Sequence, residues 1–219
     1  MNFKVKTHNA IADTGISILK GESFSISEEE NDPDAIILRS YKLPEDELSI
    51  SLKAVARAGA GFNNVPVSKC SELGIVVFNT PGANANAVKE IVLAGLLMSS
   101  RGIFAGVNFI KGIEGVSADD LKSHVESGKK EFKGRELKDG TLGVVGMGAI
   151  GAQVANMGVM LDMNVLGYDP AITIEAAWKL PNKVSKSDDL KSVFMNSDYV
   201  TLHVPAIEAT KNLVDKELL

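Results

Sequence analysis

The chain of 219 residues has little cysteine, few aromatic side chains and no long apolar run. Cys70 is the only cysteine, so no disulfide forms within the chain, which agrees with a reducing compartment. The longest apolar stretch, residues 91–98, is much shorter than the ~20 residues that a membrane-spanning helix needs. The first residues contain no apolar signal-peptide core. We therefore expect a cytoplasmic protein with no membrane partner.

The sequence also lacks an excess of basic residues. It contains 23 Lys and Arg against 28 Asp and Glu, for a net charge of −5. Nucleic-acid-binding proteins concentrate positive charge on one face, whereas the lysines of residues 129–138 are interspersed with Glu131 and Glu136. We expect no nucleic-acid partner and no metal site. Apolar residues make up 45% of the chain, which is enough to form a core.

Short apolar runs alternate with helical patterns in the first third of the chain. The runs 3–5, 35–38, 54–56 and 75–78 favour strands, and residues 11–19 and 67–73 favour helices. This alternation is typical of a parallel sheet with helices on its faces, and it predicts a flavodoxin-like, doubly wound domain over residues 1–86. Turns follow three of these strands at residues 39–40, 59–61 and 79–82, and we expect them to share one rim, where such sheets bind ligands.

The second part, residues 87–219, begins with one long helix over 87–110, broken near Gly102 or Gly106 if at all. It is apolar almost all round, which predicts burial on more than one side. Residues 112–140 indicate a surface connection with a short helix near 118–126. The remaining pattern is strand 141–145, helix 149–161, strand 164–168, helix 174–180, a weak strand near Val184, helix 187–195 and strand 199–204. It predicts an incomplete Rossmann domain and an α/β protein of two doubly wound parallel-sheet domains.

A GxGxxG motif, formed by Gly146, Gly148 and Gly151, links the strand TLGVV to the helix AIGAQVANMGVML. The next strand ends in Asp169, 18 residues after the third glycine, close to the ~20 that dinucleotide-binding units show. The first glycine permits the tight turn, the second lets a pyrophosphate approach the backbone, and the third lets the helix pack on the strand. The helix start then offers free N–H groups to the phosphates.

Asp169 predicts the choice of cofactor. A carboxylate accepts hydrogen bonds from ribose hydroxyls and repels a 2′-phosphate, and the following Pro170 and Ala171 supply no arginine to hold one. We therefore predict NAD rather than NADP. The alternative is an ordinary glycine turn with Asp169 as a plain strand-end residue, but strand, glycines, helix and acid all agree with a nucleotide site.

Four segments together resemble one known family. They are ARAGAGFNNVPVSKCSELGIVVFNTPGANANAVKE (residues 56–90), TLGVVGMGAIG, VLGYDP and SDYVTLHVP. They look like the D-3-phosphoglycerate dehydrogenases, which are D-isomer-specific 2-hydroxyacid dehydrogenases. The resemblance implies NAD-dependent oxidation of 3-phosphoglycerate to 3-phosphohydroxypyruvate in serine biosynthesis. It also implies a cytoplasmic homodimer that associates through the cofactor domain.

The resemblance further implies roles for individual residues. On the substrate side it points to Arg39 and Ser40 facing the phosphate or carboxylate, Arg57 near the phosphate, and Asn84 on the loop near the substrate. On the cofactor side it points to Ala60, Gly146, Gly148, Ala149, Ile150, Gly151, Asp169, Val204 and Pro205. The arginines suit a phosphorylated acid, because guanidinium groups bind carboxylate and phosphate through paired hydrogen bonds. A surface salt bridge is the alternative for Arg39 and for Arg57.

The family's catalytic Arg, Glu and His are expected beyond the His-Val-Pro strand, so we assign no catalytic residue among residues 1–219. We interpret His203 as a structural residue of that strand end, and His8 and His124 as structural or exposed. We expect a fragment of a longer enzyme. Two other functions stay open: a non-catalytic NAD-binding fragment, and a sibling enzyme such as a glyoxylate or hydroxypyruvate reductase.

Overall fold

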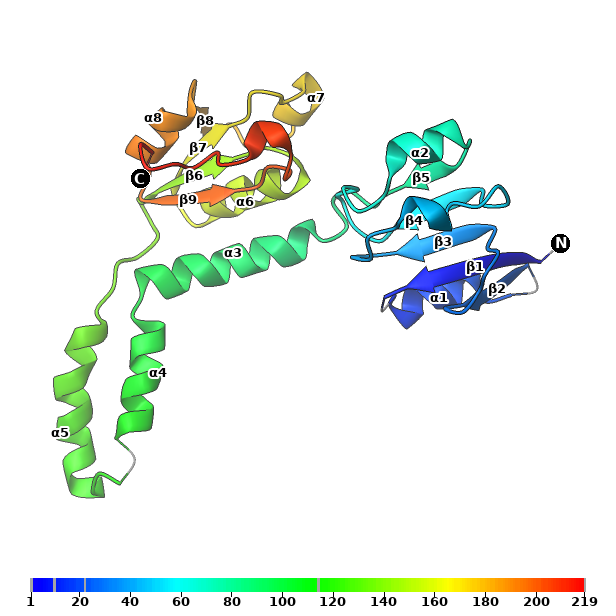
Figure 1. The fold of residues 1–219 in the computed structure, drawn as a ribbon. Coiled ribbons are helices and arrows are strands. Elements are labelled where there is room, and N and C mark those ends of the chain that lie inside the picture. The colour runs from blue at the N-terminus through cyan, green and yellow to red at the C-terminus, as the bar shows by residue number, and fades with distance from the viewer. Residues whose placement is uncertain (1, 10, 22, 114, 219) are drawn as a thin grey trace. The chain divides into compact units, whose positions relative to one another are not determined.

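A computed structural model describes residues 2–9, 11–21, 23–113 and 115–218. The chain folds as two compact units, which we call unit 1 (Met1–Asn84) and unit 2 (Ala85–Leu219). Each contains its own parallel sheet and its own hydrophobic core (Figure 1). The prediction of an α/β protein with two parallel-sheet domains is confirmed.

Unit 1 contains a five-stranded sheet in which every neighbouring pair is parallel. Its spatial order is β2-β1-β3-β4-β5, the flavodoxin-like order that the alternating pattern predicted. The strands are β1 (Phe3–His8), β2 (Phe24–Ser27), β3 (Ala35–Leu38), β4 (Ala54–Arg57) and β5 (Val76–Phe78). The sequence pattern did not predict β2, because only Phe24 and Ile26 are apolar in this strand, which alternates with serines and forms an edge with little burial.

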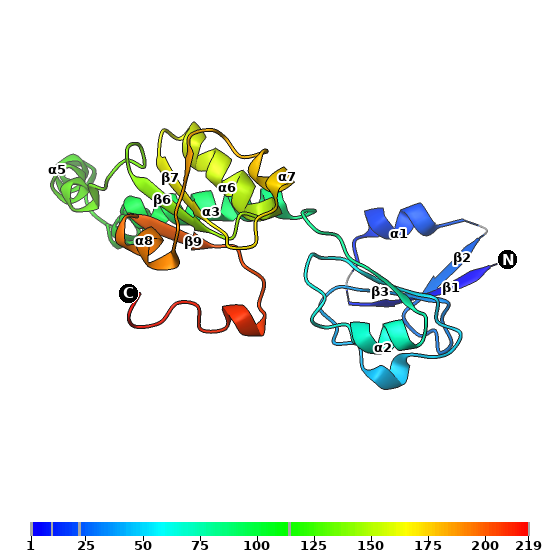
Figure 2. The same ribbon diagram turned by 90° about the horizontal axis from the view of Figure 1, so that it is seen from above.

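The helices of unit 1 lie on both faces of this sheet, with α1 (Asp13–Leu19) on one and α2 (Val67–Glu72) on the other (Figure 2). A short 3₁₀ helix, η1 (Glu45–Glu47), follows β3. The centre of the core is formed by the fully buried Leu38, Val55 and Cys70. Burial also raises the pKa of the Cys70 thiol, which keeps it protonated as an apolar core group.

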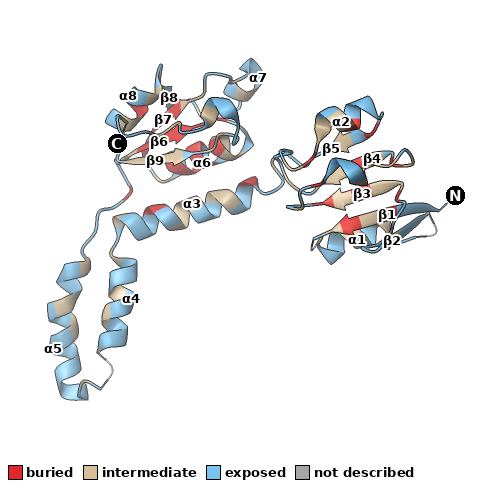
Figure 3. Ribbon diagram, in the orientation of Figure 1, coloured by how far each residue is buried: buried red, intermediate tan, exposed pale blue. Residues whose placement is uncertain are grey.

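Unit 2 contains a four-stranded parallel sheet in the order β8-β7-β6-β9. The strands are β6 (Thr141–Val145), β7 (Asn164–Tyr168), β8 (Val184–Lys186) and β9 (Tyr199–Leu202). This is the first-four-strand arrangement 3-2-1-4 of a Rossmann sheet, as the pattern predicted. Buried residues concentrate in β6 and in the helix that follows it (Figure 3).

Helices cover both faces of the unit 2 sheet. α6 (Ala149–Met160) packs on one face, where Gly158 lies against Leu142 and Val165. α3 (Ala85–Ser100) packs on α6 and adds Leu96 to the core. α8 (Leu190–Met195) covers the other face, because Gly143 points opposite to its neighbour Leu142 and meets Val193. Two shorter elements are α7 (Ile174–Ala177) and η3 (Glu208–Thr210).

Several helices of unit 2 begin where a side chain caps the first turn. Ser117 accepts a hydrogen bond from the N–H of Asp120 at 3.2 Å, Thr173 from that of Ala176 at 3.2 Å, and Asp189 from that of Ser192 at 2.8 Å. These caps start α5 (Ala118–Gly128), α7 and α8. The short helix near residues 118–126 is therefore confirmed, while α7 and α8 are shorter than the sequence predicted.

The helical stretch expected over residues 87–110, with a possible break near Gly102 or Gly106, is broken near Gly102 into two helices. α3 ends at Ser100 and α4 (Ile103–Gly112) begins after Gly102, with a bend of 65° between them. Gly102 allows a close approach here, since a Cβ on it would lie 3.1 Å from Phe132 Cα. In the described part of the chain, no single helix is long and apolar enough to cross a membrane. Only this bent pair, taken together, has enough length and apolar character.

The prediction that this helical stretch is buried on more than one side is wrong. Ile91 of α3 and Phe104 of α4 are each 74% exposed. α4 pairs with α5 and with the 3₁₀ helix η2 (Lys129–Phe132), and the Phe109 ring stacks on His124 with centroids 5.5 Å apart. An apolar helix surface that its own chain leaves exposed is typical of an association surface.

Gly143 provides a test of the unit 2 packing. An alanine Cβ would lie 2.5 Å from Val193 Cγ1 and 2.6 Å from Ser197 Oγ, so Gly143→Ala should lower the free energy of unfolding by about 1–3 kcal/mol. Gly95→Ala is the matched control, because that Cβ meets nothing within 4 Å, and it should leave stability equal or slightly higher. Urea unfolding followed by circular dichroism measures both; equal midpoints for the two variants would contradict this packing.

Candidate functional site

The turn after β6 brings backbone segments closer than side chains would allow. Gly146 has a φ of +89°, and a Cβ there would lie 2.6 Å from the backbone oxygen of His203. Gly151, one turn into α6, lies so close to the Gly146 carbonyl that a Cβ would overlap it. Gly146 and Gly151 therefore let β6, β9 and α6 meet at a single point, as the motif predicted.

Gly148 has a different role, since a Cβ on it would meet nothing within 4 Å. It is the N-cap residue of α6, and the first helical hydrogen bond runs from the N–H of Ala152 to its carbonyl at 2.9 Å. The N–H groups of Ala149 and Ile150 precede that bond and have no partner within the helix. Free space above Gly148 beside these N–H groups makes a cradle suited to a pyrophosphate.

Asp169 lies directly after β7 and faces this turn. Its carboxylate accepts a hydrogen bond from the N–H of Met147 at 2.8 Å and another from the N–H of Ala171 at 2.9 Å. The side chain therefore points at the glycine turn, which is the geometry that ribose recognition requires. These residues fit NAD: a cradle without side chains, a helix start and an acid beside them.

Val204 and Pro205 follow β9 on the same side of unit 2. Val204 lies against Gly146, since a Cβ there would be 3.0 Å from Val204 Cγ1, whereas Pro205 is exposed one residue further on. The N–H of His203 donates to the Val145 carbonyl at 2.7 Å, and its ring Nε2 lies 2.9 Å from Thr201 Oγ1. Burial lowers the pKa of His203 and keeps the ring neutral, in keeping with a structural role at the end of this strand.

In unit 1, the turns after β3 and β4 are joined at one rim. Arg39 and Ser40 follow β3, and Arg57 is the last residue of β4. Arg57 Nε donates to the Arg39 carbonyl at 3.1 Å, and its guanidinium lies over Gly59, where a Cβ would overlap it. The structure thus places Arg39, Ser40 and Arg57 together, as the shared-rim argument expected.

The turn after β5 adjoins this rim through backbone contacts. Asn79 Nδ2 donates to the Ala60 carbonyl at 2.8 Å, and the N–H of Thr80 donates to the Gly59 carbonyl at 3.0 Å. Ala60, in the turn after β4, therefore lies beside the turn after β5. Asn84 is exposed in the turn that precedes α3, and within the described ranges no hydrogen bond ties its side chain to the rim.

Among the residues that the structure describes, neither Arg39 nor Arg57 has a carboxylate within ion-pair distance. The described residues therefore do not form the surface salt bridge that was the alternative for Arg39 and for Arg57. The Arg57 guanidinium, together with the exposed Arg39 whose backbone it contacts, can bind an anionic ligand at this rim.

The sequence analysis missed a polar cluster beside this rim. The His8 ring stacks on Tyr41 with centroids 3.9 Å apart, and His8 Nε2 lies 3.1 Å from Glu47 Oε2. The Tyr41 hydroxyl donates to Glu47, which raises the pKa of Tyr41. Burial opposes ionisation of Glu47, but the hydrogen bond from Tyr41 and the nearby His8 and Lys6 lower its pKa overall. The one available signal was that His8 ends β1 and that Tyr41 closely follows β3, the strand beside it in the sheet.

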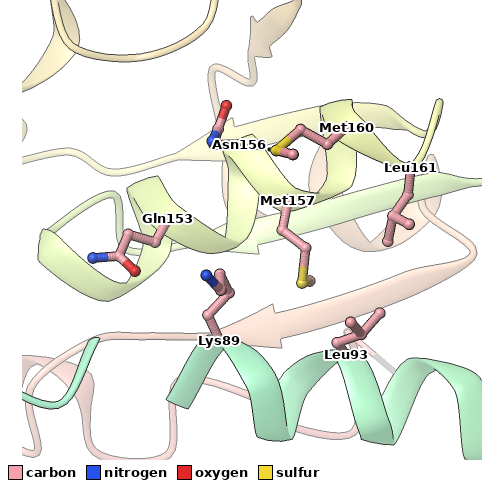
Figure 4. Close-up of a pocket in the computed structure, with 7 residues that line it drawn as sticks. All are labelled: Lys89, Leu93, Gln153, Asn156, Met157, Met160 and Leu161. Carbon is pink, nitrogen blue, oxygen red and sulfur yellow. Dashed lines mark hydrogen bonds between the residues drawn. The ribbon is translucent and has the colours of Figure 1, made fainter. Parts of the chain in front are cut away.

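Unit 2 also carries an open groove of about 450 Å³ between α3 and α6 (Figure 4). Met157 points from α6 toward α3, and Leu93 points back from α3. The complete lining is Lys89, Leu93, Gln153, Asn156, Met157, Met160 and Leu161. None of these residues belongs to the glycine turn, so the groove is separate from the nucleotide cradle.

The two alanine variants of the motif should separate binding from folding. Gly148→Ala puts a methyl group into the open cradle, so NADH binding should be lost while the free energy of unfolding changes by less than about 1 kcal/mol. Gly151→Ala overlaps the Gly146 carbonyl and should destabilise unit 2 by at least about 1–3 kcal/mol. NADH fluorescence titration and urea unfolding measure these effects. Unchanged NADH affinity in Gly148→Ala would place the pyrophosphate elsewhere.

Comparison with known proteins agrees with this geometry. Residues 107–219, just over half of the chain, match the family model described as "D-isomer specific 2-hydroxyacid dehydrogenase, NAD binding domain". The chain is 34% identical over 189 residues to D-3-phosphoglycerate dehydrogenase of Methanocaldococcus jannaschii, an alignment covering 85% of this chain and 33% of that protein. It is 36% identical over 187 residues to hydroxypyruvate reductase of Thermotoga maritima, covering 84% of this chain and 55% of that protein.

A solved structure shows the same fold. The 3-phosphoglycerate dehydrogenase of Entamoeba histolytica with bound NAD⁺ superposes with a TM-score of 0.72 at 26% identity, covering 100% of this chain and 68% of that one. The chain thus spans between a third and just over half of the two curated relatives named above. The family model, the relatives and the glycine cradle agree, and the chain belongs to the D-isomer-specific 2-hydroxyacid dehydrogenase family, with an NAD-binding domain in its second half.

Proposed function

We propose that this chain is the part of a D-3-phosphoglycerate dehydrogenase in which unit 1 binds the phosphorylated 2-hydroxy acid and unit 2 binds NAD. The observation that carries this proposal is that Arg57 contacts the backbone of the exposed Arg39 at one rim of unit 1, and that neither arginine has a carboxylate partner among the described residues. A phosphorylated hydroxy acid carries about three negative charges, which two arginines suit better than the single charge of an unphosphorylated acid. We place the boundary between the substrate-binding part and the NAD-binding part after residue 86, two residues beyond the end of unit 1.

Individual residues have separate parts in this function. Arg39, Ser40 and Arg57 bind the anionic groups of the substrate, and Asn84 lies on the substrate side. Gly146, Gly148, Ala149, Ile150 and Gly151 cradle the pyrophosphate, Asp169 holds the adenosine ribose, Val204 and Pro205 line the adenine, and Ala60 contacts the nicotinamide side. NAD, when bound, accepts the hydride from the substrate carbon. We assign no acid–base residue to the chain, and His203, whose carbonyl lies against Gly146, supports the glycine turn.

A hydroxypyruvate reductase is the second candidate, because the Thermotoga maritima relative carries that name at 36% identity. Its substrate lacks the phosphate, so the two candidates differ in what the arginine rim must recognise. The comparison of 3-phosphoglycerate with glycerate therefore distinguishes them. A non-catalytic NAD-binding fragment is the third candidate, and it predicts NADH binding without binding of 3-phosphoglycerate.

Arg57→Ala tests the substrate site. Removing the guanidinium should weaken 3-phosphoglycerate binding about 10- to 100-fold, since hydrogen bonds between charged groups are the strong ones. Arg135→Ala is the matched control, because Arg135 is exposed in unit 2 outside both proposed sites. Isothermal titration of the 219-residue chain with 3-phosphoglycerate and with glycerate measures both affinities. Equal affinity in Arg57→Ala would remove this residue from the site, and equal binding of the two acids would favour the reductase.

We also infer a homodimer that forms through unit 2. The apolar residues Ile103, Phe104, Val107 and Ile110 are exposed on α4, at spacings that put most of them on one helix face. The groove between α3 and α6, with the exposed Met160 at its edge, adds a second unpartnered apolar surface in the same unit. Both surfaces fit a second copy of this chain, because each can then be buried against unit 2 of the partner.

Phe104→Asp should disrupt this dimer. A carboxylate at the centre of an apolar contact has no partner there, so the variant should sediment as a monomer of 23.3 kDa while the unaltered chain sediments at twice that mass. Ile18→Asp is the control, because Ile18 is at least as exposed as Phe104 but lies on α1 of unit 1. Analytical ultracentrifugation at micromolar concentration decides, and a monomeric unaltered chain would refute the dimer.

A further inference from the structure

The turn formed by residues 39–41, which carries Arg39 and Ser40, is held by side chains from distant parts of unit 1. On one side, Asn9 Oδ1 accepts hydrogen bonds from the N–H of Tyr41 at 2.6 Å and from the N–H of Ser40 at 3.1 Å. The Ser40 hydroxyl lies 3.4 Å from the same oxygen. Asn9 directly follows β1 and has a φ of +67°, a left-handed conformation that asparagine adopts more readily than other residues with a side chain.

On the other side, Asn64 holds the carbonyl groups of the same turn. Its Nδ2 donates to the Arg39 carbonyl at 3.2 Å and to the Tyr41 carbonyl at 2.6 Å. This fixes the orientation of the amide, because a flipped amide would face two carbonyl oxygens with a third oxygen. Asn64 Oδ1 is buried and, within the described residues, has no hydrogen-bond partner. The chain therefore tolerates a buried unpaired acceptor for the sake of the two donated bonds.

The two asparagines together pair four backbone polar groups of a three-residue turn: two N–H groups with Asn9 and two carbonyls with Asn64. Arg57 Nε adds a second bond to the Arg39 carbonyl. The far end of the turn is fixed through Tyr41, whose ring stacks on His8 and whose hydroxyl donates to Glu47. Ser40 thus lies between two fixed neighbours, although its own hydroxyl is exposed at the rim.

A binding group that is already held in place loses less conformational freedom when the ligand arrives, so it binds more tightly. We propose that Asn9 and Asn64 are positioning residues for substrate binding, which hold the 39–41 turn so that Arg39 and Ser40 face the anionic group of the substrate. This inference rests on the proposed function of unit 1. It adds two residues that do not touch the substrate but set the shape of the segment that does.

Asn64→Asp and Asn9→Asp form a matched pair that tests this role. Each places one new negative charge beside the same turn, so the electrostatic part of the loss in anion affinity is shared by both variants. Asn9→Asp keeps the accepting oxygen, whereas Asn64→Asp loses the donor and faces two carbonyl oxygens with a carboxylate. We expect Asn64→Asp to bind 3-phosphoglycerate about tenfold more weakly than Asn9→Asp in isothermal titration of the 219-residue chain.

Amide hydrogen exchange separates positioning from general stability. In Asn64→Asp, the N–H groups of Ser40 and Tyr41 should exchange faster while those in β3 and β4 keep their protection. Faster exchange throughout β3 and β4 would show a merely structural role and would overturn the proposal. Asn64→Ala adds no charge and replaces the aspartate variant if that variant does not fold. Its control is Asn31→Ala, because Asn31 precedes β3 and so lies at the amino ends of the strands, away from the rim. We expect Asn64→Ala to bind about tenfold more weakly than Asn31→Ala.

The outcomes distinguish this inference from the function on which it rests. Equal affinity in the two aspartate variants, or in the two alanine variants, overturns the positioning role and leaves the substrate site standing. Absence of 3-phosphoglycerate binding by the unaltered chain overturns both. A gap of about tenfold with exchange changes confined to the 39–41 turn supports the proposal.

Discussion

The nucleotide end of unit 2 depends on one constraint: its backbone segments approach more closely than any Cβ permits. Gly146 touches the His203 carbonyl, and Gly151 touches the Gly146 carbonyl. The Asp169 carboxylate then binds the N–H of Met147 across the same turn. These contacts fix the ends of β6, β7 and β9 and the start of α6 around a cradle that is formed by backbone atoms. Such a site is rigid before a ligand arrives, and its exposed N–H groups need no side chain to be placed.

Unit 1 meets a related problem with side chains. Parallel strands bring their carboxyl ends to one rim, but the turns that follow them leave N–H and carbonyl groups outside the sheet ladder. The glycine turn of unit 2 leaves such N–H groups free for a ligand, whereas the 39–41 turn of unit 1 has them paired by Asn9 and Asn64. In the proposed function, the ligand groups of unit 1 are then side chains: Arg39 and Ser40 on this turn, and Arg57 at the end of β4 beside it.

The sequence predicted those features that depend on local pattern. The alternation of strands and helices predicted the flavodoxin-like sheet and the Rossmann sheet, and the glycine spacing with Asp169 predicted the cradle. What it missed depends on tertiary contacts. Asn9 and Asn64 reach the 39–41 turn from 31 and 25 residues away, and no local periodicity records such a bond. The break after α3 was predicted as a possibility. The predicted burial of the two helices was wrong, because an apolar helix has the same composition in a core and at an association surface.

This contrast determines where specificity resides. A cradle built from backbone atoms recognises what all dinucleotides share, and only Asp169 adds a choice between cofactors. A rim built from side chains can change its ligand by changing one residue, and the charge of Arg39 and Arg57 sets how many anionic groups it accepts. Family membership therefore follows from unit 2. In the proposed function, unit 1 selects the acid, and there a turn held by two asparagines gives the binding side chains a defined geometry.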